Sequence, residues 1–323
     1  MKVRSDACPD LHGLEPSVDA FFDELILGLS RHPKSIAPKF FYDEIGSQLF
    51  DEICCLEEYY LTRTEMRILR ERIGEICALF GPECRLVEFG SGSNAKTRIL
   101  LDHLRAPAYV PVDIAREHLL QCSARLARSY PELCIRPVCA DFTTAFALPE
   151  VPGGVRRTVA FFPGSTIGNL EPAEAENFLR RIAMLCGTGS GLLIGVDMKK
   201  DRLTLERAYN DARGVTARFN LNLLARINRA FDAGIRSDNF RHHAFYNEEF
   251  GRIEMHLVSL VEQTIQLNGT TFFFEEGEHI VTEHSYKYSL DEFARLAVRS
   301  GWAVKRLWTD AANLFSVQYL VVE

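Results

Sequence analysis

The sequence lacks any apolar run that approaches the 18 residues of a membrane-spanning helix. Residues 1–6 also lack the apolar core of a signal peptide. Basic residues never stand in runs longer than two, and 37 Lys and Arg against 44 Asp and Glu leave a formal charge of −7. Because nucleic-acid binding depends on clustered cations that neutralise phosphates, this balance argues against general nucleic-acid binding. We therefore expect a cytoplasmic protein whose partners include neither a membrane nor a nucleic acid.

Metal-binding patterns are missing as well. The nine cysteines are an odd number, which fits a disulfide framework poorly, and no C-x-x-C pair occurs among them. Several lie in apolar runs, as Cys77 does, where a free thiol packs as a small hydrophobe. The adjacent His242 and His243 would point in opposite directions on a strand, and no ligand partner is spaced for them. We expect reduced, structural cysteines and no metal.

The composition that remains is that of a folded globular chain. Of 323 residues, 47% are hydrophobic and 25% are charged, which excludes low-complexity, collagen-like and coiled-coil chains. A chain of this length has room for about two domains, at roughly 100–200 residues each.

Short apolar strands alternate with helical patterns from residue 85 to residue 197. This alternation predicts right-handed β-α-β units and a parallel sheet. The expected strands are residues 85–89, 108–113, 134–140, 158–162 and 192–196. The expected helices lie near residues 94–104 and 116–129 and begin again at Pro172.

The pattern changes after Asp197. Residues 214–234 have the apolar periodicity of one long helix, and an alternating strand is expected around residues 253–257. Asn268 and Gly269 stand between two β-rich runs, which is a strong hairpin signal.

The last part of the sequence returns to a helix and two strands. Ser289 and Glu292 form a capping box for a helix that stops at Gly301. Residues 303–308 and 315–322 are separated by a short turn and are expected to close the sheet as an antiparallel hairpin.

The N-terminal part of the chain lacks this alternation of strands and helices. A helix is expected near residues 18–30, then an aromatic-rich loop, and Thr62 with Glu65 forms a capping box that would start a long helix. We therefore expect one α/β domain and a second lobe divided around it. The domain would comprise residues 64–199 and 288–323, and the lobe residues 1–63 and 200–287.

A glycine-rich turn follows the first expected strand. Gly90 and Gly92 let the backbone turn tightly, and the helix behind them offers free N–H groups to a ligand. A phosphate loop nearly fits, because Lys96 and Thr97 stand in register, but Ala95 replaces its second glycine. A dinucleotide-binding turn and a turn that binds S-adenosylmethionine fit as well.

Acidic residues mark the ends of the first three strands. Glu88 precedes the turn, Asp113 ends the second strand, and Asp141 with Phe142 ends the third. These ends meet at the sheet edge where α/β proteins bind ligands, so the carboxylates could accept ribose hydroxyls while Asp141 and Phe142 hold an adenine. Each Asp could instead simply cap a helix. Acidic residues at three strand ends in succession, together with the terminal hairpin, favour the interpretation that the turn binds S-adenosylmethionine.

Several longer segments are similar to the histidine Nα-methyltransferases of ergothioneine biosynthesis. The similarity extends from about residue 16 to the end of the chain. It is carried by PKSIAPKFFYD at residues 33–43, EYYLTRTE at 58–65, the turn at 90–98, GSTIGNL at 164–170 and TEHSYK at 282–287. The family implies a Rossmann-like, S-adenosylmethionine-dependent methyltransferase sheet with a second, α+β substrate-binding lobe. Its reaction is trimethylation of the α-amino group of L-histidine to hercynine.

The resemblance also implies residue roles. It assigns to the methyl donor Gly90, Lys96, Asp113, Asp141 and Phe142. It assigns to the histidine pocket Tyr59, Asn169, Tyr209, Glu283, Ser285 and, as an apolar wall of the imidazole slot, Met255. Beside the reacting amine it assigns Tyr42 and Gly164. The sequence departs from familiar members at His284 and Tyr286, which could alter packing near the ring.

These roles are chemically coherent. In-line methyl transfer needs an aligned, neutral amine, which the Tyr42 hydroxyl would orient. Asn169 and Tyr209 offer donors to the substrate carboxylate. Glu283 would accept from one imidazole N–H and Ser285 would serve the other nitrogen. A site that satisfies both ring nitrogens rejects side chains without them.

Two other functions fit parts of the sequence. The acceptor could be tryptophan or another aromatic amino acid, although an indole needs no acidic partner for a second ring nitrogen. The chain could also be a non-catalytic nucleotide-binding protein whose Gly90 turn holds ATP. We expect a monomeric enzyme whose partners are L-histidine and S-adenosylmethionine.

Overall fold

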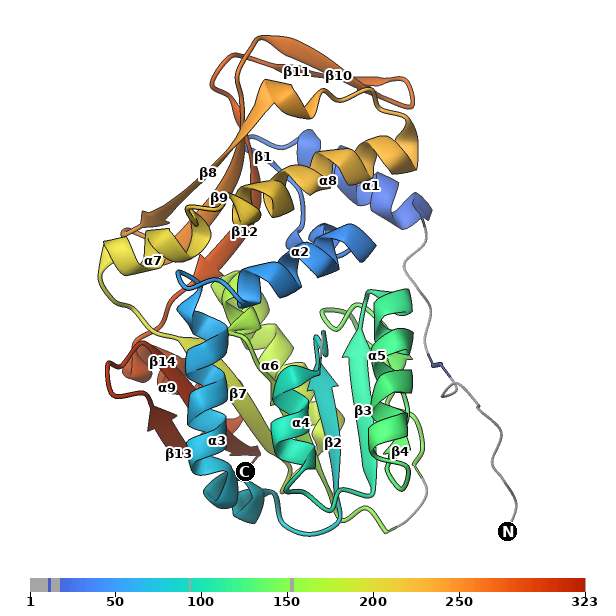
Figure 1. The fold of residues 1–323 in the computed structure, drawn as a ribbon, viewed down its shortest axis with the longest axis vertical. Helices are drawn as coiled ribbons and strands as arrows, with labels where there is room; N and C mark the ends of the chain where they lie inside the picture. Colours follow the sequence, from blue (N-terminus) through green and yellow to red (C-terminus); the bar gives the residue numbers. More distant parts are fainter. Residues whose placement is uncertain (1–10, 13–17, 93, 152–153, 323) are drawn as a thin grey trace.

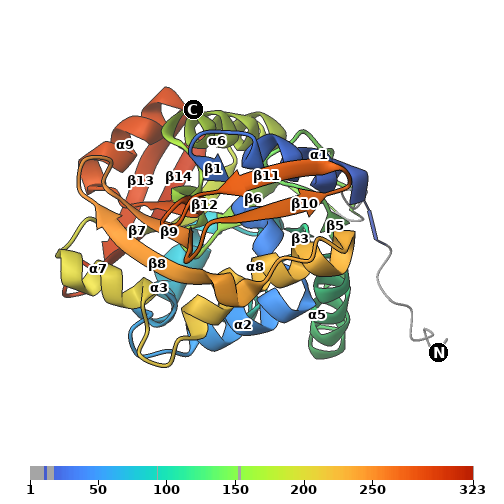
Figure 2. The same cartoon turned by 90° about the horizontal axis from the view of Figure 1, so that it is seen from above.

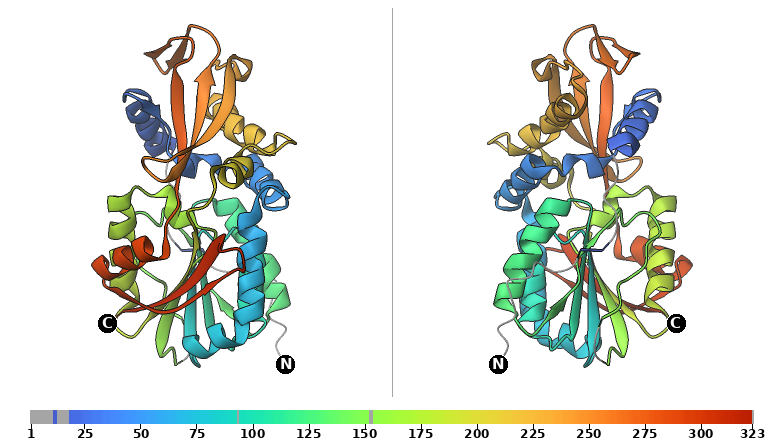
Figure 3. Two further views of the ribbon diagram at one scale, coloured as in Figure 1. Left: turned by 90° about the vertical axis from the view of Figure 1, so that its left-hand side faces the viewer. Right: turned by 90° about the vertical axis from the view of Figure 1, so that its right-hand side faces the viewer.

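Two separate sheets organise the chain along its long axis (Figures 1 and 3). The structure, a computed structural model, describes residues 11–12, 18–92, 94–151 and 154–322. Cys8, Ser93 and parts of the expected second lobe (residues 1–10 and 13–17) lie outside the described residues.

The larger sheet has eight strands, in the order β13-β14-β7-β6-β2-β3-β4, with β5 also paired to β3. Strands β2 to β7 are parallel, whereas β14 is antiparallel to both β7 and β13. The strands are β2 (Cys84–Phe89), β3 (Ala108–Asp113), β4 (Cys134–Ile135), β5 (Val138–Cys139), β6 (Arg157–Phe162), β7 (Gly191–Asp197), β13 (Trp302–Thr309) and β14 (Phe315–Val322).

Helices cover both faces of this sheet (Figure 3). One face carries α3 (Tyr60–Phe80), α4 (Ala95–Leu101) and α5 (Arg116–Ser129), and the other carries α6 (Pro172–Cys186) and α9 (Leu290–Arg299). Successive residues of a strand point to opposite faces, so Leu86 belongs to one core cluster and Val87 to another. Because both faces are buried, the central strands are almost continuously apolar.

The smaller sheet has the order β1-β12-β9-β8 and lies between α1 and α8 (Figures 2 and 3). Its strands are β1 (Lys34–Ser35), β8 (Phe240–Asn247), β9 (Arg252–Ser259) and β12 (His279–Tyr286). The helices around it are α1 (Val18–Leu29), α2 (Glu44–Cys54), α7 (Arg202–Tyr209) and α8 (Val215–Phe231), with the short turns η1 (Pro38–Phe41) and η3 (Ser237–Asn239). A hairpin of β10 (Gln263–Leu267) and β11 (Thr270–Phe274) extends beyond it (Figure 1).

Strand β12 leads directly from the smaller sheet to the larger one. Just past its end, the Tyr288 N–H donates to the Asp197 carbonyl at 3.2 Å, and the Lys199 N–H donates to the Tyr288 carbonyl at 3.1 Å. Side chains near the end of β12 are therefore held against the carboxyl end of β7, where parallel strands present ligand sites.

Most expected elements are present. The terminal hairpin, the Asn268-Gly269 hairpin and the capping box of Ser289 and Glu292 are confirmed. The strand expected at residues 134–140 is divided into β4 and β5 around Pro137, which has no N–H to donate to a ladder.

Two predictions at the front of the chain were wrong. Helix α3 begins at Tyr60 rather than after Thr62, and Tyr59 is its N-cap residue. The expected aromatic loop contains helix α2, whose first turn is capped when the Gly46 N–H donates to the Asp43 carboxylate at 2.7 Å. In the described part of the chain, no helix is both long and apolar enough to cross a membrane.

Candidate active site

Seven of the predicted residues line one cavity between segments from the two halves of the molecule. They come from the loop after η1, the start of α3, the loop after β6, the short turn η2 (Thr166–Asn169), the end of α7, and β12. The lining residues are Tyr42, Phe50, Tyr59, Gly164, Ser165, Thr166, Asn169, Tyr209, Glu283 and Ser285. Residues that are up to 243 positions apart in sequence thus meet at one site.

A bulge in β12 sets which side chains face this cavity. Its pairing with β9 shifts between Val281 and Glu283, and the Thr282 hydroxyl donates to the Met255 carbonyl at 2.9 Å. Beyond the bulge, Glu283 and Ser285 share one face of the strand. Met255 pairs with Glu283 on the neighbouring strand and is 1% exposed, but it does not line the cavity.

Glu283 is the acidic group of the cavity. Its side chain is buried, which raises the carboxyl pKa to about 7, while the nearby Lys287 ammonium opposes this rise. Near neutral pH the carboxyl group is therefore poised between its acceptor and donor forms, and an N–H group beside it favours the ionised acceptor.

Aromatic rings enclose another side of the cavity. Tyr42 contacts Phe50 and Phe219 edge-on, with centroids 5.7 and 5.9 Å apart, and Tyr59 contacts Tyr209 at 6.3 Å. Burial raises the pKa of both Tyr42 and Tyr59 well above that of a free phenol. Their hydroxyl groups consequently stay protonated at neutral pH. In this form they can orient a ligand by hydrogen bonding, but they cannot act as a phenolate base.

The loop that carries Gly164 is held by a buried carboxylate from α3. The Gly164 N–H donates to both oxygens of Glu65, at 3.1 and 2.9 Å, and the Lys96 ammonium lies 2.6 Å from Glu65 Oε2. Gly164 has φ +83°, and a Cβ there would lie 3.3 Å from Lys96 Nζ. Glu65 is thus a positioning residue; we had expected it only to cap a helix.

Behind the cavity, two pocket hydroxyls meet a buried cation. Tyr209 Oη and Ser285 Oγ lie 2.9 Å apart, and Lys287 Nζ donates to them at 3.0 and 2.8 Å. The same ammonium lies 3.0 Å from Asp197 Oδ2, and this pair is fully buried. Each ion stabilises the charge of the other, so the pKa of Asp197 is lowered and that of Lys287 is raised, although burial opposes both shifts.

Four of the five predicted donor-binding residues lie at the carboxyl ends of β2, β3 and β5, and Lys96 lies on α4. The Gly92 N–H donates to Asp113 Oδ2 at 3.2 Å, and the Ala115 N–H donates to Oδ1 at 3.0 Å, which ties the glycine turn to the end of β3. Gly90 has φ +70°, in the left-handed region that favours glycine. Among the described atoms, a Cβ on Gly92 would meet none within 4 Å, so no described side chain packs against the turn at this position.

Asp141 is held between the two halves of the molecule. Its carboxylate accepts the Thr143 N–H at 2.8 Å and the Lys39 ammonium at 2.9 Å. Burial opposes ionisation, but these bonds outweigh it and the pKa of Asp141 is lowered. Phe142 packs edge-on against Phe162, with centroids 5.6 Å apart, and its ring lies 3.8 Å from where a Gly90 Cβ would be.

Glu88 is engaged within the domain. It is 1% exposed and accepts hydrogen bonds from Tyr109 and Thr97, and burial raises its pKa to about 8. Its carboxyl group therefore secures the turn to β3 and α4 and has no role in the cavity.

Sequence reasoning missed three cavity residues. Ser165 and Thr166 stand inside the GSTIGNL segment, where their position beside Gly164 was the available signal. Phe50 lies on α2, which was not expected as a helix. Conversely, His284 and Tyr286 face away from the cavity toward Glu171, to which they donate at 2.5 and 2.6 Å.

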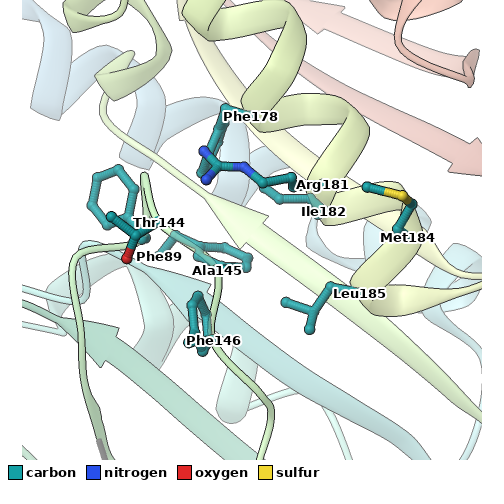
Figure 4. A pocket seen from close by; sticks show the side chains of 10 residues that line it. Phe89, Thr144, Ala145, Phe146, Phe178, Arg181, Ile182, Met184 and Leu185 are labelled. Atoms are coloured by element: carbon teal, nitrogen blue, oxygen red, sulfur yellow. The ribbon is translucent and has the colours of Figure 1, made fainter. Parts of the chain in front are cut away.

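A larger apolar pocket lies elsewhere, between residues 144–146 and α6 (Figure 4). Its volume is about 280 Å³, and much of its lining is supplied by Phe89, Phe146, Phe178, Ile182 and Leu185. Phe142 is the predicted site residue that it contains. Among the described residues, no group of three or more His, Cys, Asp or Glu is placed to hold a metal ion.

The sheet order and the glycine turn are typical of S-adenosylmethionine-dependent methyltransferases, α/β enzymes with an antiparallel pair beside a parallel sheet. A family profile described as histidine-specific methyltransferase, SAM-dependent, matches residues 21–322, and the chain belongs to this family.

Curated relatives agree with this assignment. The chain is 40% identical over 313 residues to histidine N-alpha-methyltransferase of Mycolicibacterium smegmatis, covering 95% of this chain and 96% of that protein. It is 42% identical over 299 residues to the protein of the same name from Mycobacterium tuberculosis, covering 90% and 91%. It is 29% identical over 285 residues to ergothioneine biosynthesis protein 1 of Neurospora crassa, covering 86% of this chain and 32% of that longer protein.

Proposed function

We propose that this enzyme transfers three methyl groups to the α-amino group of L-histidine, which yields hercynine for ergothioneine biosynthesis. The observation that carries the proposal is the meeting of an acidic group, Glu283, with the hydroxyl pair of Tyr209 and Ser285 in one buried cavity. A neutral imidazole has one N–H donor and one nitrogen acceptor, which this combination matches. Membership of the histidine-specific family supports the same substrate.

The pocket residues divide between the ring and the amino-acid end of the substrate. Glu283 accepts the imidazole N–H, and Ser285 meets the other ring nitrogen. Asn169 donates to the carboxylate, Tyr209 lies beside it and bonds to Ser285, and Tyr59 bounds the space between them. Met255 supports Glu283 from the neighbouring strand.

Tyr42 and the Gly164 loop serve the reacting amine. The raised pKa of Tyr42 leaves a protonated hydroxyl, which orients the amine but does not remove its proton. Glu65 holds the Gly164 backbone, and a fixed position for the amine supplies the alignment that an in-line displacement needs.

The donor side consists of Gly90, Lys96, Asp113, Asp141 and Phe142. The left-handed glycine turn and the carboxylates at the strand ends support binding of S-adenosylmethionine, which when bound supplies the methyl group on a sulfonium. Asp113 and Asp141 offer carboxylate oxygens at the strand ends, and Phe142 offers an aromatic ring beside Gly90. Lys96 reaches this region from α4 and is held by Glu65.

Each of the two larger sheets belongs to one proposed functional part of the chain. Residues 64–199 and 288–323 form the methyltransferase domain, and residues 1–63 and 200–287 form the substrate-binding lobe. We also infer a cytoplasmic monomer that needs no metal.

Mass spectrometry of L-histidine incubated with the enzyme and S-adenosylmethionine tests the function. A mass gain of three methyl groups on the α-amino nitrogen is expected. A faster reaction with tryptophan than with histidine would show that the preferred acceptor is another aromatic amino acid. Calorimetric binding of ATP without any binding of S-adenosylmethionine would refute an enzyme of this class.

A further inference from the structure

The buried ammonium of Lys287 has three N–H donors and three acceptors. These are Tyr209 Oη at 3.0 Å, Ser285 Oγ at 2.8 Å and Asp197 Oδ2 at 3.0 Å. The Lys287 side chain has no exposed surface, and Lys287 does not line the cavity. Its contact with the substrate site therefore passes entirely through the two hydroxyl groups.

These bonds restrict where the two hydroxyl protons can point. Tyr209 and Ser285 each accept from Lys287 and lie 2.9 Å from one another, so one of them donates to the other. If Tyr209 donates, the Ser285 proton is left for the cavity, and if Ser285 donates, the Tyr209 proton is left. In either arrangement the pair offers one proton, which requires an acceptor atom on the ligand.

We propose that Lys287 is a positioning residue for the substrate, which it controls by fixing the hydroxyl protons of Tyr209 and Ser285. This inference rests on histidine being the substrate. With Tyr209 donating to Ser285, the free proton lies on Ser285. With Glu283 as the acceptor on the other side, the cavity then presents one donor and one acceptor to the ring, which selects the neutral imidazole.

Lys200 provides a matched control. Its side chain is 7% exposed and pairs with Asp197, at 2.7 Å, but it donates to the hydroxyl of Tyr60 at 2.7 Å and not to a cavity hydroxyl. Lys287→Met and Lys200→Met each remove one cation from the same carboxylate, and each leaves Asp197 with the other cation and with Tyr60.

The decisive measurement is steady-state kinetics with L-histidine and S-adenosylmethionine as varied substrates. Lys287→Met is expected to raise the KM for histidine about tenfold, the loss expected for hydrogen bonds to a charged partner, while the KM for S-adenosylmethionine changes less than about twofold. In a Tyr209→Phe/Ser285→Ala background, the same substitution should change the histidine KM less than about twofold, because the two hydroxyl groups through which Lys287 acts are already absent.

Several results would overturn the proposal. They are an unchanged histidine KM in Lys287→Met, an equal rise in Lys200→Met, or an undiminished effect in the Tyr209→Phe/Ser285→Ala background. A wild-type enzyme that does not methylate histidine would refute the proposed function instead, which separates the two failures.

A wild-type measurement covers the case in which Lys287→Met does not fold. Pyrrolylalanine keeps a ring N–H for Glu283 but has no ring nitrogen acceptor, whereas histidine has both. The fixed proton requires that wild-type enzyme bind pyrrolylalanine about tenfold more weakly than histidine, and that Ser285→Ala reduce this preference. Equal binding of the two amino acids would contradict a fixed donor.

Discussion

The carboxylate of Glu65 accepts the backbone N–H of Gly164 through both of its oxygens, at 3.1 and 2.9 Å. Glu65 lies on α3 and is completely buried, whereas Gly164 lies in the loop after β6 that borders the cavity. Because the same carboxylate pairs with Lys96 at 2.6 Å, one side chain fixes both the Gly164 loop and a predicted donor-binding residue.

Glu65→Ala should therefore impair both stability and catalysis. It leaves the half-buried Lys96 ammonium and the half-buried Gly164 N–H without their partner, which is expected to lower the free energy of unfolding by about 1–3 kcal/mol. Glu65→Gln keeps an acceptor for Gly164 and should lose less. Denaturant unfolding and kcat/KM for histidine measure the two effects, and a Glu65→Ala enzyme with wild-type values would show that the contact is dispensable.

Glu283→Ala should change substrate preference. Loss of the acceptor for the imidazole N–H is expected to lower kcat/KM for histidine about 100-fold, whereas tryptophan should lose less because its ring needs no second acceptor. Parallel assays with both amino acids provide the comparison. Equal losses of kcat/KM for the two amino acids would show that Glu283 does not bind the imidazole ring.

The raised pKa of Glu283, about 7, predicts a pH dependence. Below pH 7 the carboxyl group gains a proton and loses its acceptor role, so kcat/KM for histidine should fall on the acidic side with a midpoint near 7. Glu283→Gln should lack that ionisation and retain the ionisation of the substrate itself. Identical acidic limbs in the two enzymes would assign the ionisation to another group.

The same shift affects stability in the opposite direction. The folded state binds the Glu283 proton more tightly than the unfolded state, whose carboxyl pKa is near 4.5, so this group makes the free energy of unfolding fall as the pH rises from 4.5 to 7. Glu283→Gln should remove this contribution, which is on the order of 3 kcal/mol at most. Unfolding of the two proteins at pH 5 and pH 8 checks the sign: the variant should gain relative stability at the higher pH.

Glu171 connects the helix after Asn169 to β12 and β9. It accepts from His284 at 2.5 Å, Tyr286 at 2.6 Å and Arg252 at 3.2 Å. Glu171→Ala should raise the KM for histidine several-fold and lower the free energy of unfolding by about 1–3 kcal/mol, because these partners lose a shared acceptor. Glu176→Ala offers a control on the same helix.

The control separates a local role from a general effect on α6. Glu176 contacts Arg180 and Arg299 at the surface and should leave the histidine KM unchanged. A wild-type histidine KM in Glu171→Ala would show that this connection does not position the pocket.

Predictions from the sequence succeeded where the signal is local. The parallel strands were found because buried strands are apolar throughout, and the hairpin at Asn268 because its turn residues favour positive φ. The same local rules failed around Thr62 and Glu65. A capping pattern was present there, but the Glu65 carboxylate is used across the fold by Gly164 and Lys96.

The sequence by itself determined the type of sheet, the glycine turn at its edge and, through long segments similar to a family, seven of the ten residues that line the cavity. Tertiary structure alone decided that Lys287 lies behind Tyr209 and Ser285, that Glu88 is engaged internally, and that His284 and Tyr286 face Glu171. The physical reason is that periodicity reports which residues are buried, whereas the partner of a buried polar group is set by strands and helices that are distant in sequence.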